Sequence, residues 1–335
     1  MSRIAVMGGG AWGTAIVLSL DRKGGHTLNL WTHSADVAAE IRASGENKAF
    51  LPGFPLPRHI TVTNHADEAL RDAEIVVSVM PSHYVRASYE LFAPHLKPGQ
   101  ILVSATKGIE DHTYLRTSQV IAEVLGSHKR DLHFGVLSGP SFAREVAAGS
   151  PTAVTIASSD ANLASRVQRE FSSATLRLYT NDDVVGVELG GALKNVIAIA
   201  TGMVSGLGLG HNSTAALITR GVSEVTRLAV ACGGRRETLA GLSGIGDLVL
   251  TCTGALSRNR WVGVELAKGR PLTEVLAGLH GRVAEGVRTA AAALGLARQY
   301  GVELPITEQV DAILRGARLP EQAMQELMSR PGRDE

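Results

Sequence analysis

The sequence predicts an α/β protein in which a Rossmann-like doubly wound sheet is followed by an all-helical C-terminal domain. Two observations support this fold class. Up to about residue 180, short β-branched apolar runs alternate with segments of helical periodicity, as in successive βαβ units. After residues 181–183, strand-like runs become rare and long helix-like segments follow. We therefore expect an α/β domain over residues 1–180 and a helical domain over residues 181–335.

Eight runs in the first half are predicted to be strands. Several are continuously apolar, which is typical of parallel strands that are covered on both faces. The runs are IAVM (4–7), LNLW (28–31), ITVT (60–63), EIVVSVM (74–80), QILVSAT (100–106), FGVLS (134–138), AVTIAS (153–158) and LRLYT (176–180). Helical periodicity is clear between them, for example over residues 66–73 and 113–126.

Five segments in the second half have helix-like patterns, namely 183–209, 213–232, 257–268, 284–300 and 319–329. Residues 181–183 (Asn-Asp-Asp) offer an N-cap for the first of these helices, and residues 212–214 (Asn-Ser-Thr) offer one for the second. Ser257 is a candidate N-cap for the third.

The composition is that of an ordinary globular protein of two domains. The chain has 335 residues, of which 44% are hydrophobic and 19% are charged, and its net charge is +1. This charge balance gives no sign of a nucleic-acid-binding surface. Two cysteines, Cys232 and Cys252, provide neither a disulfide framework nor a metal-ligand cluster, so we expect no metal.

No apolar stretch reaches the ~20 uninterrupted residues that a membrane span requires. Residues 186–212 come closest, but they contain glycines, Glu188 and Lys194. The chain opens on a strand-like run rather than a secretory leader. We expect a cytoplasmic protein without membrane insertion. A homodimer through the helical half is one option that the sequence leaves open.

A G-x-G-x-x-G pattern, formed by Gly8, Gly10 and Gly13, lies between the first strand and a helical run. This context is specific for a dinucleotide-binding loop. Gly8 would make the tight turn, Gly10 would let the backbone approach a pyrophosphate, and Gly13 would allow close packing of helix on strand. The alternative is a glycine-rich turn that binds no ligand.

The end of the second predicted strand bears on the choice between NAD and NADP. NAD-selective folds place an acidic residue there to bind the ribose hydroxyls. Residues 30–34 read Leu-Trp-Thr-His-Ser, and no acid occurs before Asp36. A 2′-phosphate would therefore meet no carboxylate, and His33 could contact it. Alternatively, His33 only caps the strand, so both cofactors stay open.

Lys194 is an unexpected residue in an apolar, glycine-rich helix. Helical spacing places Gly190 and Gly191 on its face, toward the helix N-terminus, where helical side chains lean. Glycine costs roughly 1 kcal/mol in a helix interior, so we infer that a helix or a substrate approaches closely there. The alternative is a snorkelling surface lysine beside a glycine-mediated helix crossing.

Two further segments contain residues suited to a polar site. Asp247 and Thr251 are four residues apart and therefore on one face of a short helix. Arg258 and Asn259 follow Ser257 in a first helical turn, where an arginine gains nothing from the helix dipole. An anion that docks there would explain it, because arginine grips phosphates in a bidentate manner. The alternative is a solvent-facing basic helix start.

Lys107 and residues 138–143 (Ser-Gly-Pro-Ser-Phe-Ala) each follow the carboxyl end of a predicted strand. Ligands of open α/β sheets bind at this edge. The small residues Gly139 and Ser141 leave backbone donors accessible. A loop lysine by itself indicates little, but Lys107 follows the fifth strand-like run beside the predicted nicotinamide cleft, which makes it a candidate for a ligand site.

These residues together resemble the bacterial-type NAD(P)-dependent glycerol-3-phosphate dehydrogenases. The matching stretches are GGGAWGTA, VMPSH, TKGIE, LSGPSFAREVAAGSPTAV, ELGGALKNVIAIATGM, GLGLGHNSTAALITRG, GLSGIGDLVLTCTG, SRNR and VAEGV. They extend from residue 4 to about residue 310, and their joint order is highly specific. The resemblance implies a Rossmann-like dinucleotide domain over 1–180 and a helical substrate domain over 181–335.

The resemblance also implies the roles of individual residues. Lys194 would exchange a proton with the reacting carbonyl, with Lys107 and Asp247 as further catalytic residues. The residues expected at the substrate are Lys107, Gly139, Ser141, Lys194, Asn195, Asp247, Thr251, Ser257, Arg258 and Asn259. Those expected at NAD or NADP are Gly8, Gly10, Ala11, Trp12, Gly13, His33, Phe50, Lys107, Ala143, Arg258, Val283 and Glu285.

The implied reaction reduces dihydroxyacetone phosphate to sn-glycerol 3-phosphate, which would supply glycerophospholipid synthesis. The sequence departs from the family beside His33, where members often carry an arginine, and this leaves NADP selectivity open. Two other functions remain alternatives. One is a related two-domain reductase acting on a β-hydroxyacid or a sugar acid phosphate. The other is a non-catalytic dinucleotide sensor, which would have no use for Lys194, Asp247 and Arg258 together.

Overall fold

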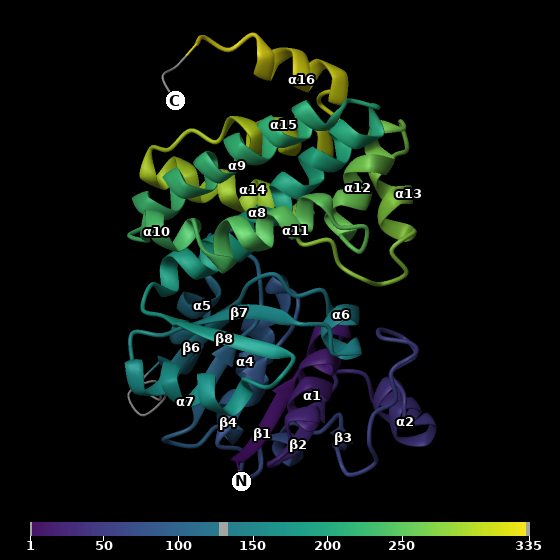
Figure 1. Cartoon of the computed structure of the whole chain (residues 1–335), viewed down its shortest axis with the longest axis vertical. Coiled ribbons are helices and arrows are strands. Elements are labelled where there is room, and N and C mark those ends of the chain that lie inside the picture. Colours follow the sequence, from purple (N-terminus) through teal and green to yellow (C-terminus); the bar gives the residue numbers. More distant parts are fainter. Residues whose placement is uncertain (1, 127–132, 333–335) are drawn as a thin grey trace. The chain divides into compact units, whose positions relative to one another are not determined.

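The computed structural model describes residues 2–126 and 133–332. The chain divides into two compact units (Figure 1). One, called here the sheet unit, comprises Met1–Lys107 and Leu115–Glu188; the other, the helical unit, comprises Gly108–Tyr114 and Leu189–Glu335.

The described residues of the sheet unit form an eight-stranded sheet in the order β3-β2-β1-β4-β5-β6-β7-β8. Its strands are β1 (Ser2–Met7), β2 (His26–Trp31), β3 (Thr61–Thr63), β4 (Ile75–Ser78), β5 (Ile101–Ser104), β6 (His133–Ser138), β7 (Thr152–Ala157) and β8 (Leu176–Asn181). All eight predicted runs are strands. Neighbouring strands are parallel except for β6 and β7, which pair antiparallel. An apolar run does not reveal strand direction, so this reversal was not predicted.

Helices cover both faces of the sheet, as the doubly wound prediction required. They are α1 (Ala11–Lys23), α2 (Ala35–Ser44), α3 (Ala66–Leu70), α4 (Val85–Phe92), α5 (Thr117–Leu125), α6 (Ala143–Ala148) and α7 (Ala161–Phe171), with 3-10 turns η1 (Ser82–Tyr84) and η2 (Ala93–His95). Side chains alternate along β1 because successive strand residues point to opposite faces. Ile4 and Val6 enter the core with α1, α2, α6 and α7, whereas Ala5 and Met7 enter the core with α3, α4 and α5.

The topological switch point lies between β1 and β4. From β1 the chain continues outward to β2 and β3 on one side, and from β4 it continues to β5 and β6 on the other. The backbone holds the two strand ends together, since Val79 N–H donates to the Met7 carbonyl at 3.0 Å. The glycine loop after β1 therefore lies at the edge where such sheets bind ligands.

Among the described residues of the helical unit there is no strand, so the all-helical prediction is confirmed. Its elements are α8 (Val184–Gly206, whose first five residues belong to the sheet unit), α9 (His211–Ala231), α10 (Arg236–Leu239), the π-helical turn η4 (Leu242–Gly246), α11 (Asp247–Thr253), α12 (Arg258–Ala267), α13 (Leu272–Ala277), α14 (Gly286–Tyr300), α15 (Pro305–Leu314) and α16 (Pro320–Met328).

The predicted helix caps have different outcomes. Asp183 caps α8, because its Oδ1 accepts from the Gly186 N–H at 2.8 Å. Ser257 caps α12 by accepting from the Arg260 N–H at 3.2 Å. The prediction that residues 212–214 cap α9 was wrong: the helix already begins at His211, with Gly210 in the cap position and no side-chain cap.

Helix α8 is the central helix of the helical unit, and Figure 1 shows other helices around it. Its length and composition would also suit a membrane span, but 89% of its apolar window is buried inside the protein, as in a core helix. Glycines permit this packing. A Cβ on Gly202 would lie 2.0 Å from the Arg260 carbonyl oxygen, and one on Gly263 would lie 2.0 Å from that of Ile199. Helices α8 and α12 therefore cross in backbone contact.

Candidate active site

The three glycines of the loop after β1 have different surroundings. Gly8 has φ +144°, and a Cβ there would lie 1.8 Å from the Val79 carbonyl oxygen. A Cβ on Gly13 would lie 1.9 Å from the Gly8 carbonyl oxygen, whereas one on Gly10 would meet nothing within 4 Å. Gly8 and Gly13 are thus required by the fold itself. Gly10 keeps an open surface, which fits the close approach of a ligand.

The start of α1 suits an anionic group. Gly10 occupies the N-cap position without a side-chain cap, and the first turn contains no acidic residue. The first backbone N–H groups of a helix have no intrahelical acceptor and carry positive partial charge. The indole N–H of Trp12 is buried and finds no acceptor among the described residues. These unsatisfied donors fit the phosphates of a dinucleotide.

The end of β2 presents no carboxylate, as the sequence indicated. His33 is exposed and stands edge-on to Trp31, with ring centroids 6.1 Å apart. Ser34 caps α2 by accepting from the Val37 N–H at 3.3 Å. Asp36 is exposed in the first turn of α2. Among residues 2–126 and 133–332, no hydrogen bond supports the alternative role of His33 as a strand cap.

Lys107, Gly139 and Ser141 come together at the carboxyl ends of β5 and β6. Lys107 Nζ donates to the Gly139 carbonyl at 2.9 Å, and Ser141 Oγ donates to the same oxygen at 2.9 Å. Gly139 has φ +136°, and a Cβ there would lie 2.9 Å from Val154 Cα. Ala143 begins α6 and packs partly buried against the sheet core. The two predicted loops therefore form one polar cluster.

Lys194 lies inside the helical unit rather than at its surface, with only 7% of the residue exposed. Its Nζ donates to Asp247 Oδ1 in an ion pair and to Thr251 Oγ1 at 2.8 Å. Thr251 Oγ1 donates in turn to the Asp247 carbonyl at 2.7 Å. Helix α11 thus presents Asp247 and Thr251 on one face toward Lys194. The snorkelling alternative is wrong, because the ammonium is buried and paired.

The glycine beside Lys194 has a packing explanation. A Cβ on Gly190 would lie 2.5 Å from the Ser243 carbonyl oxygen and 3.2 Å from a methyl carbon of Leu239. The π-helical turn therefore rests directly on the α8 backbone one turn before Lys194. This close approach places the start of α11, and so Asp247, within reach of the lysine.

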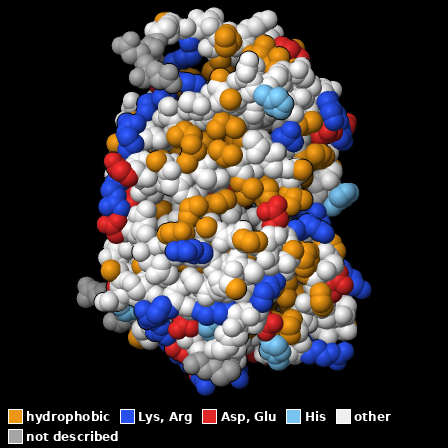
Figure 2. Space-filling view, viewed as in Figure 1, with side chains coloured by type: hydrophobic (Ala, Val, Ile, Leu, Met, Phe, Trp, Pro, Cys, Tyr) orange, Lys and Arg blue, Asp and Glu red, His pale blue; other side chains and the backbone are white. Residues whose placement is uncertain are grey.

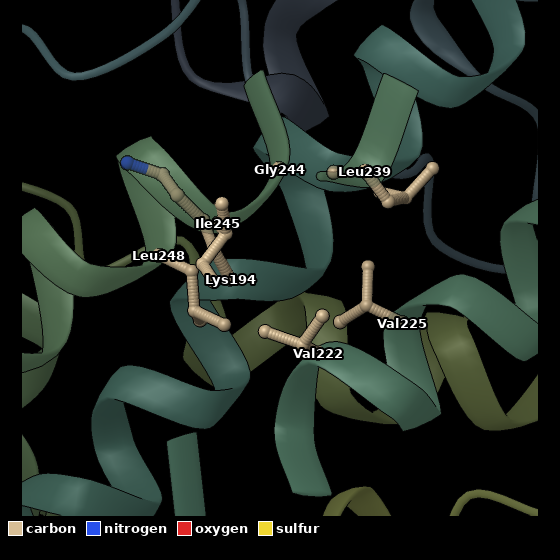
Figure 3. A pocket seen from close by; sticks show the side chains of 8 residues that line it. Lys194, Val222, Val225, Leu239, Gly244, Ile245 and Leu248 are labelled. Atoms are coloured by element: carbon tan, nitrogen blue, oxygen red, sulfur yellow. The ribbon is translucent and has the colours of Figure 1, made fainter. Parts of the chain in front are cut away.

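A small apolar pocket follows the alkyl stem of Lys194 (Figure 3). Its lining residues are Gly190, Lys194, Val222, Val225, Leu239, Gly244, Ile245 and Leu248. The space between these side chains amounts to about 200 Å³, including the part that opens to solvent. In Figure 3 the amine of Lys194 points away from Val222 and Val225. The pocket therefore lies along the stem of Lys194 and does not receive its amine.

A second polar chain joins three helices of the same unit. Asn259 Nδ2 on α12 donates to Asn195 Oδ1 on α8 at 2.9 Å, and Asn259 Oδ1 accepts from the Gly286 N–H of α14 at 2.9 Å. A Cβ on Gly286 would lie 2.5 Å from the Asn195 carbonyl oxygen. Asn195 follows Lys194 in sequence, so this chain fixes the backbone beside the buried amine.

Arg258 lies at the start of α12 and is exposed. The protein around its guanidinium still lowers the pKa of Arg258 by desolvation; Glu285 opposes this effect and Arg282 adds to it. Arginine side chains remain protonated in proteins, so Arg258 stays cationic at neutral pH. An exposed, permanent cation at the start of a helix suits a group that binds an anion. Val283 and Glu285 are partly buried in the segment before α14.

Cys252 follows Thr251 and is 1% exposed. Burial raises the pKa of its thiol to about 12, so it stays protonated and offers no thiolate nucleophile.

In residues 2–126 and 133–332, no group of three or more His, Cys, Asp or Glu side chains is arranged to hold a metal ion. On the face shown in Figure 2, basic and acidic side chains lie interspersed.

The residues predicted from the sequence thus fall into two groups. The sheet unit contains the glycine loop, His33, Phe50, Lys107, Gly139, Ser141 and Ala143. The helical unit contains Lys194, Asn195, Asp247, Thr251, Ser257, Arg258, Asn259, Val283 and Glu285. One residue of structural importance to the glycine loop, Asn47, was missed. Its segment, Glu46-Asn47-Lys48-Ala49, has no periodicity or motif that would have singled it out.

Comparison with known proteins identifies the family. The model of the NAD-dependent glycerol-3-phosphate dehydrogenase N-terminus matches residues 3–164, and that of the C-terminus matches residues 183–325. The chain is 69% identical over 338 residues to a glycerol-3-phosphate dehydrogenase [NAD(P)+] from Acidobacterium capsulatum, and each chain is covered completely. It is 58% identical to that from Koribacter versatilis, covering 100% of this chain and 99% of the relative.

A solved structure agrees with this assignment. The crystal structure of glycerol-3-phosphate dehydrogenase from Coxiella burnetii matches with a TM-score of 0.93 and 39% identity, covering 98% of this chain and 99% of that chain. Full-length matches of both sequence and fold accompany the glycine loop and the buried lysine described above. The chain therefore belongs to the family of NAD-dependent glycerol-3-phosphate dehydrogenases.

Proposed function

We propose that this protein reduces dihydroxyacetone phosphate to sn-glycerol 3-phosphate with NADPH or NADH, and that Lys194 is its general acid and base. The observation that carries the proposal is the buried ammonium of Lys194, held by Asp247 and Thr251. A buried charge is costly unless it is paired. A reaction that needs a proton at this position gives a reason to retain it.

The proton chemistry is assigned to Lys194. The reduced nicotinamide, when bound, supplies the hydride that the carbonyl carbon accepts. Negative charge then develops on the carbonyl oxygen, where the ammonium stabilises it and donates a proton. The hydroxyl is formed and Lys194 is left neutral until solvent returns its proton. The oxidation of sn-glycerol 3-phosphate uses the same steps in reverse.

Asp247 and Thr251 orient the amine in this proposal. The carboxylate compensates the charge of the resting ammonium, and the hydroxyl accepts a second N–H at 2.8 Å. These two bonds direct two of the three ammonium protons. We assign to this amine the proton that the substrate oxygen receives. Lys107 is proposed as a second cation at the substrate, together with Gly139, Ser141 and Asn195.

The phosphate of the substrate is assigned to the start of α12. Arg258 offers a planar pair of donors, and the backbone N–H groups of this first turn add others. The side chain of Asn259 already bonds Asn195 and Gly286. We therefore assign Asn259 to the phosphate mainly through its place in this turn, with Ser257 as the cap that fixes it.

The dinucleotide is assigned to the glycine loop, with Gly8, Gly10, Ala11, Trp12 and Gly13 around its phosphates. His33 and Phe50 are proposed at its adenosine end, and Ala143, Val283 and Glu285 at further positions.

We also propose that the protein is cytoplasmic, does not insert into membranes and supplies glycerophospholipid synthesis. In this proposal it takes small-molecule substrates only and forms a homodimer through its helical half. We further propose that the functional domains divide between residues 180 and 181.

Turnover by a Lys194→Met variant tests the proposal directly. We expect oxidation of NADPH or NADH with dihydroxyacetone phosphate to fall by at least ~100-fold, the usual contribution of acid–base catalysis, while the cofactor still binds. Lys268→Met provides a matched control, because Lys268 lies in the same unit but its side chain is 56% exposed. Comparing NADPH with NADH in the same assay also gives the cofactor preference.

Removal of Lys194 alone leaves Asp247 buried without its cation, which destabilises such sites by ~3–5 kcal/mol. The double variant Lys194→Met with Asp247→Asn removes that charge and should recover part of the stability without recovering turnover. A rate within tenfold of the wild type in either variant would refute the assigned role. Saturable NADPH binding without turnover in the wild type would instead favour a dinucleotide sensor.

A further inference from the structure

A fully buried asparagine lies beneath the glycine loop and belongs to none of the groups assigned above. Asn47 is 0% exposed. Its Nδ2 donates to the Gly9 carbonyl at 2.8 Å and to Thr14 Oγ1 at 2.8 Å. Its Oδ1 accepts from the Phe50 N–H at 3.3 Å. All of these residues belong to the sheet unit.

The two Nδ2 bonds hold both sides of the glycine loop. Gly9 stands between Gly8 and Gly10, and Thr14 lies in the first turn of α1, where its N–H donates to the Gly10 carbonyl at 3.0 Å. A Cβ on Gly9 would lie 2.8 Å from Thr32 Cβ. The loop therefore packs against both Asn47 and the residue that follows β2.

The remaining bonds of Asn47 hold the Phe50 segment. Its Oδ1 accepts from the Phe50 N–H, and its own carbonyl accepts from the Leu51 N–H at 2.8 Å. Leu51 is 1% exposed and belongs to the sheet core, which anchors this turn. One side chain thus sets the loop proposed for the phosphates and the aromatic residue proposed for the adenosine end.

We propose that Asn47 is a positioning residue for the dinucleotide, which preorganises the glycine loop and Phe50 relative to one another. The inference rests on the cofactor site of the proposed function. A loop held in its binding geometry does not lose conformational entropy on binding, so affinity rises without a new contact to the ligand. Asn47 then acts on cofactor affinity through Gly9, Thr14 and Phe50 and does not touch the cofactor.

The dissociation constant of NADPH, measured by calorimetry without the ketone substrate, tests this inference. For Asn47→Ala we expect roughly tenfold weaker binding, equivalent to about 1.4 kcal/mol. Asn47→Asp should bind more weakly still. This near-isosteric variant keeps an acceptor for Phe50, but it cannot donate to Gly9 and adds negative charge beside the proposed phosphate site.

Gln100 provides a matched control for a purely structural effect. It is 4% exposed, its Nε2 donates to the Ala73 carbonyl at 2.7 Å, and its Oε1 accepts from the Lys97 N–H at 2.8 Å. It therefore joins two loops by the same amide chemistry, but at the amino ends of β4 and β5. Gln100→Ala should lower the melting temperature while leaving the NADPH dissociation constant within twofold of the wild type.

Thr14→Val serves if Asn47→Ala does not fold. It removes one acceptor of Nδ2 without changing the size of the side chain, and NADPH binding should weaken by roughly two- to fivefold. The inference is overturned if the folded Asn47 and Thr14 variants bind NADPH as tightly as the wild type, whatever their melting temperatures. Its test is separate from that of the proposed function, which fails if the wild type does not turn over dihydroxyacetone phosphate.

Discussion

At the scale of single residues, the glycines of the first loop separate into Gly8 and Gly13, which the fold requires, and Gly10, which we propose is required by the ligand. We expect Gly10→Ala to keep the stability of the wild type to within about 0.5 kcal/mol, as for a substitution in open space. It should nevertheless weaken NADPH binding by tenfold or more, because its methyl group occupies the open surface beside the loop. Urea unfolding and calorimetry of the same sample measure the two effects.

Gly8→Ala is the contrasting variant. Its Cβ would lie 1.8 Å from the Val79 carbonyl oxygen, at a φ of +144° that side chains rarely adopt. We expect this variant to be severely destabilised or insoluble. If Gly10→Ala were as unstable as Gly8→Ala, the open surface at Gly10 would not be the reason for a glycine there.

Arg258 gives a second prediction at this scale, one that separates phosphate binding from catalysis. Arg258→Ala should lower kcat/KM for dihydroxyacetone phosphate by about 10- to 150-fold, corresponding to the roughly 1.5–3 kcal/mol of a charge-assisted hydrogen bond. The rate with unphosphorylated dihydroxyacetone should change little. Equal losses with both ketones would show that Arg258 does not anchor the phosphate.

The sequence was informative for residues whose type conflicts with their surroundings. Lys194 in an apolar helix and Arg258 at a helix start both stood out for that reason, and the glycine beside Lys194 correctly indicated a close approach. Asn47 could not be found in this way. A polar residue in a loop is unremarkable until its burial is known, and its partners Gly9 and Thr14 are more than 30 positions away.

At the scale of elements, strands were easier to predict than helices. All eight strands were expected. Most are short apolar runs that stand out from their flanks, whereas β8 begins with alternating buried and exposed residues, which is also a strand pattern. Helices α13 and α15 were not among the predicted segments. α13 spans only six residues, too few for a helical period to repeat. α15 depends on a distant partner that no local pattern reveals.

That partner is Glu224, on α9. Its carboxylate accepts from the Ile306 N–H at 2.8 Å, the Thr307 N–H at 2.9 Å and Thr307 Oγ1 at 2.6 Å. It therefore caps the first turn of α15 from 82 positions away. Glu224→Ala should leave these buried N–H groups without an acceptor and destabilise the protein by roughly 1–3 kcal/mol for each group. Urea unfolding measures this loss.

The pH dependence of the same site follows from the pKa of Glu224, which burial raises above its ordinary value. The folded state therefore disfavours the ionised carboxylate relative to the unfolded state. Stability contributed by Glu224 is fully present below about pH 4.5 and falls as pH rises through the raised pKa. The stability advantage of the wild type over Glu224→Gln should thus be larger at pH 5 than at pH 8. An advantage that grows with pH would contradict the raised pKa.

At the scale of the whole molecule, the division of the chain follows contacts that sequence rhythm does not record. Residues 108–114 group with the helical unit. Arg288 pairs with Asp111 at 2.7 Å across 177 positions, and a Cβ on Gly295 would lie 2.2 Å from the Tyr114 ring. Likewise, helix α8 begins in one unit and continues in the other. A change from strand-like to helix-like patterns marks where helices begin, not where contacts change.

This division gives the proposed cofactor site a feature that can be measured. Gly10 and Trp12 belong to the sheet unit, whereas Val283 and Glu285 belong to the helical unit. If one dinucleotide contacts both sets, NADPH should slow hydrogen exchange in two segments far apart in sequence, residues 8–14 and residues 283–288. Binding stabilises the bound state by about 2.7 kcal/mol at a ligand concentration 100 times the dissociation constant, which bounds the slowing at roughly 100-fold.

Helix α15 serves as the internal control in the same exchange experiment, because none of its residues is assigned to cofactor or substrate. Its exchange should change less than that of either segment. Protection confined to residues 8–14 would exclude Val283 and Glu285 from the dinucleotide site and limit that site to the sheet unit. Protection of residues 283–288 in the wild type, and its loss in Gly10→Ala at the same NADPH concentration, would assign both segments to one bound molecule.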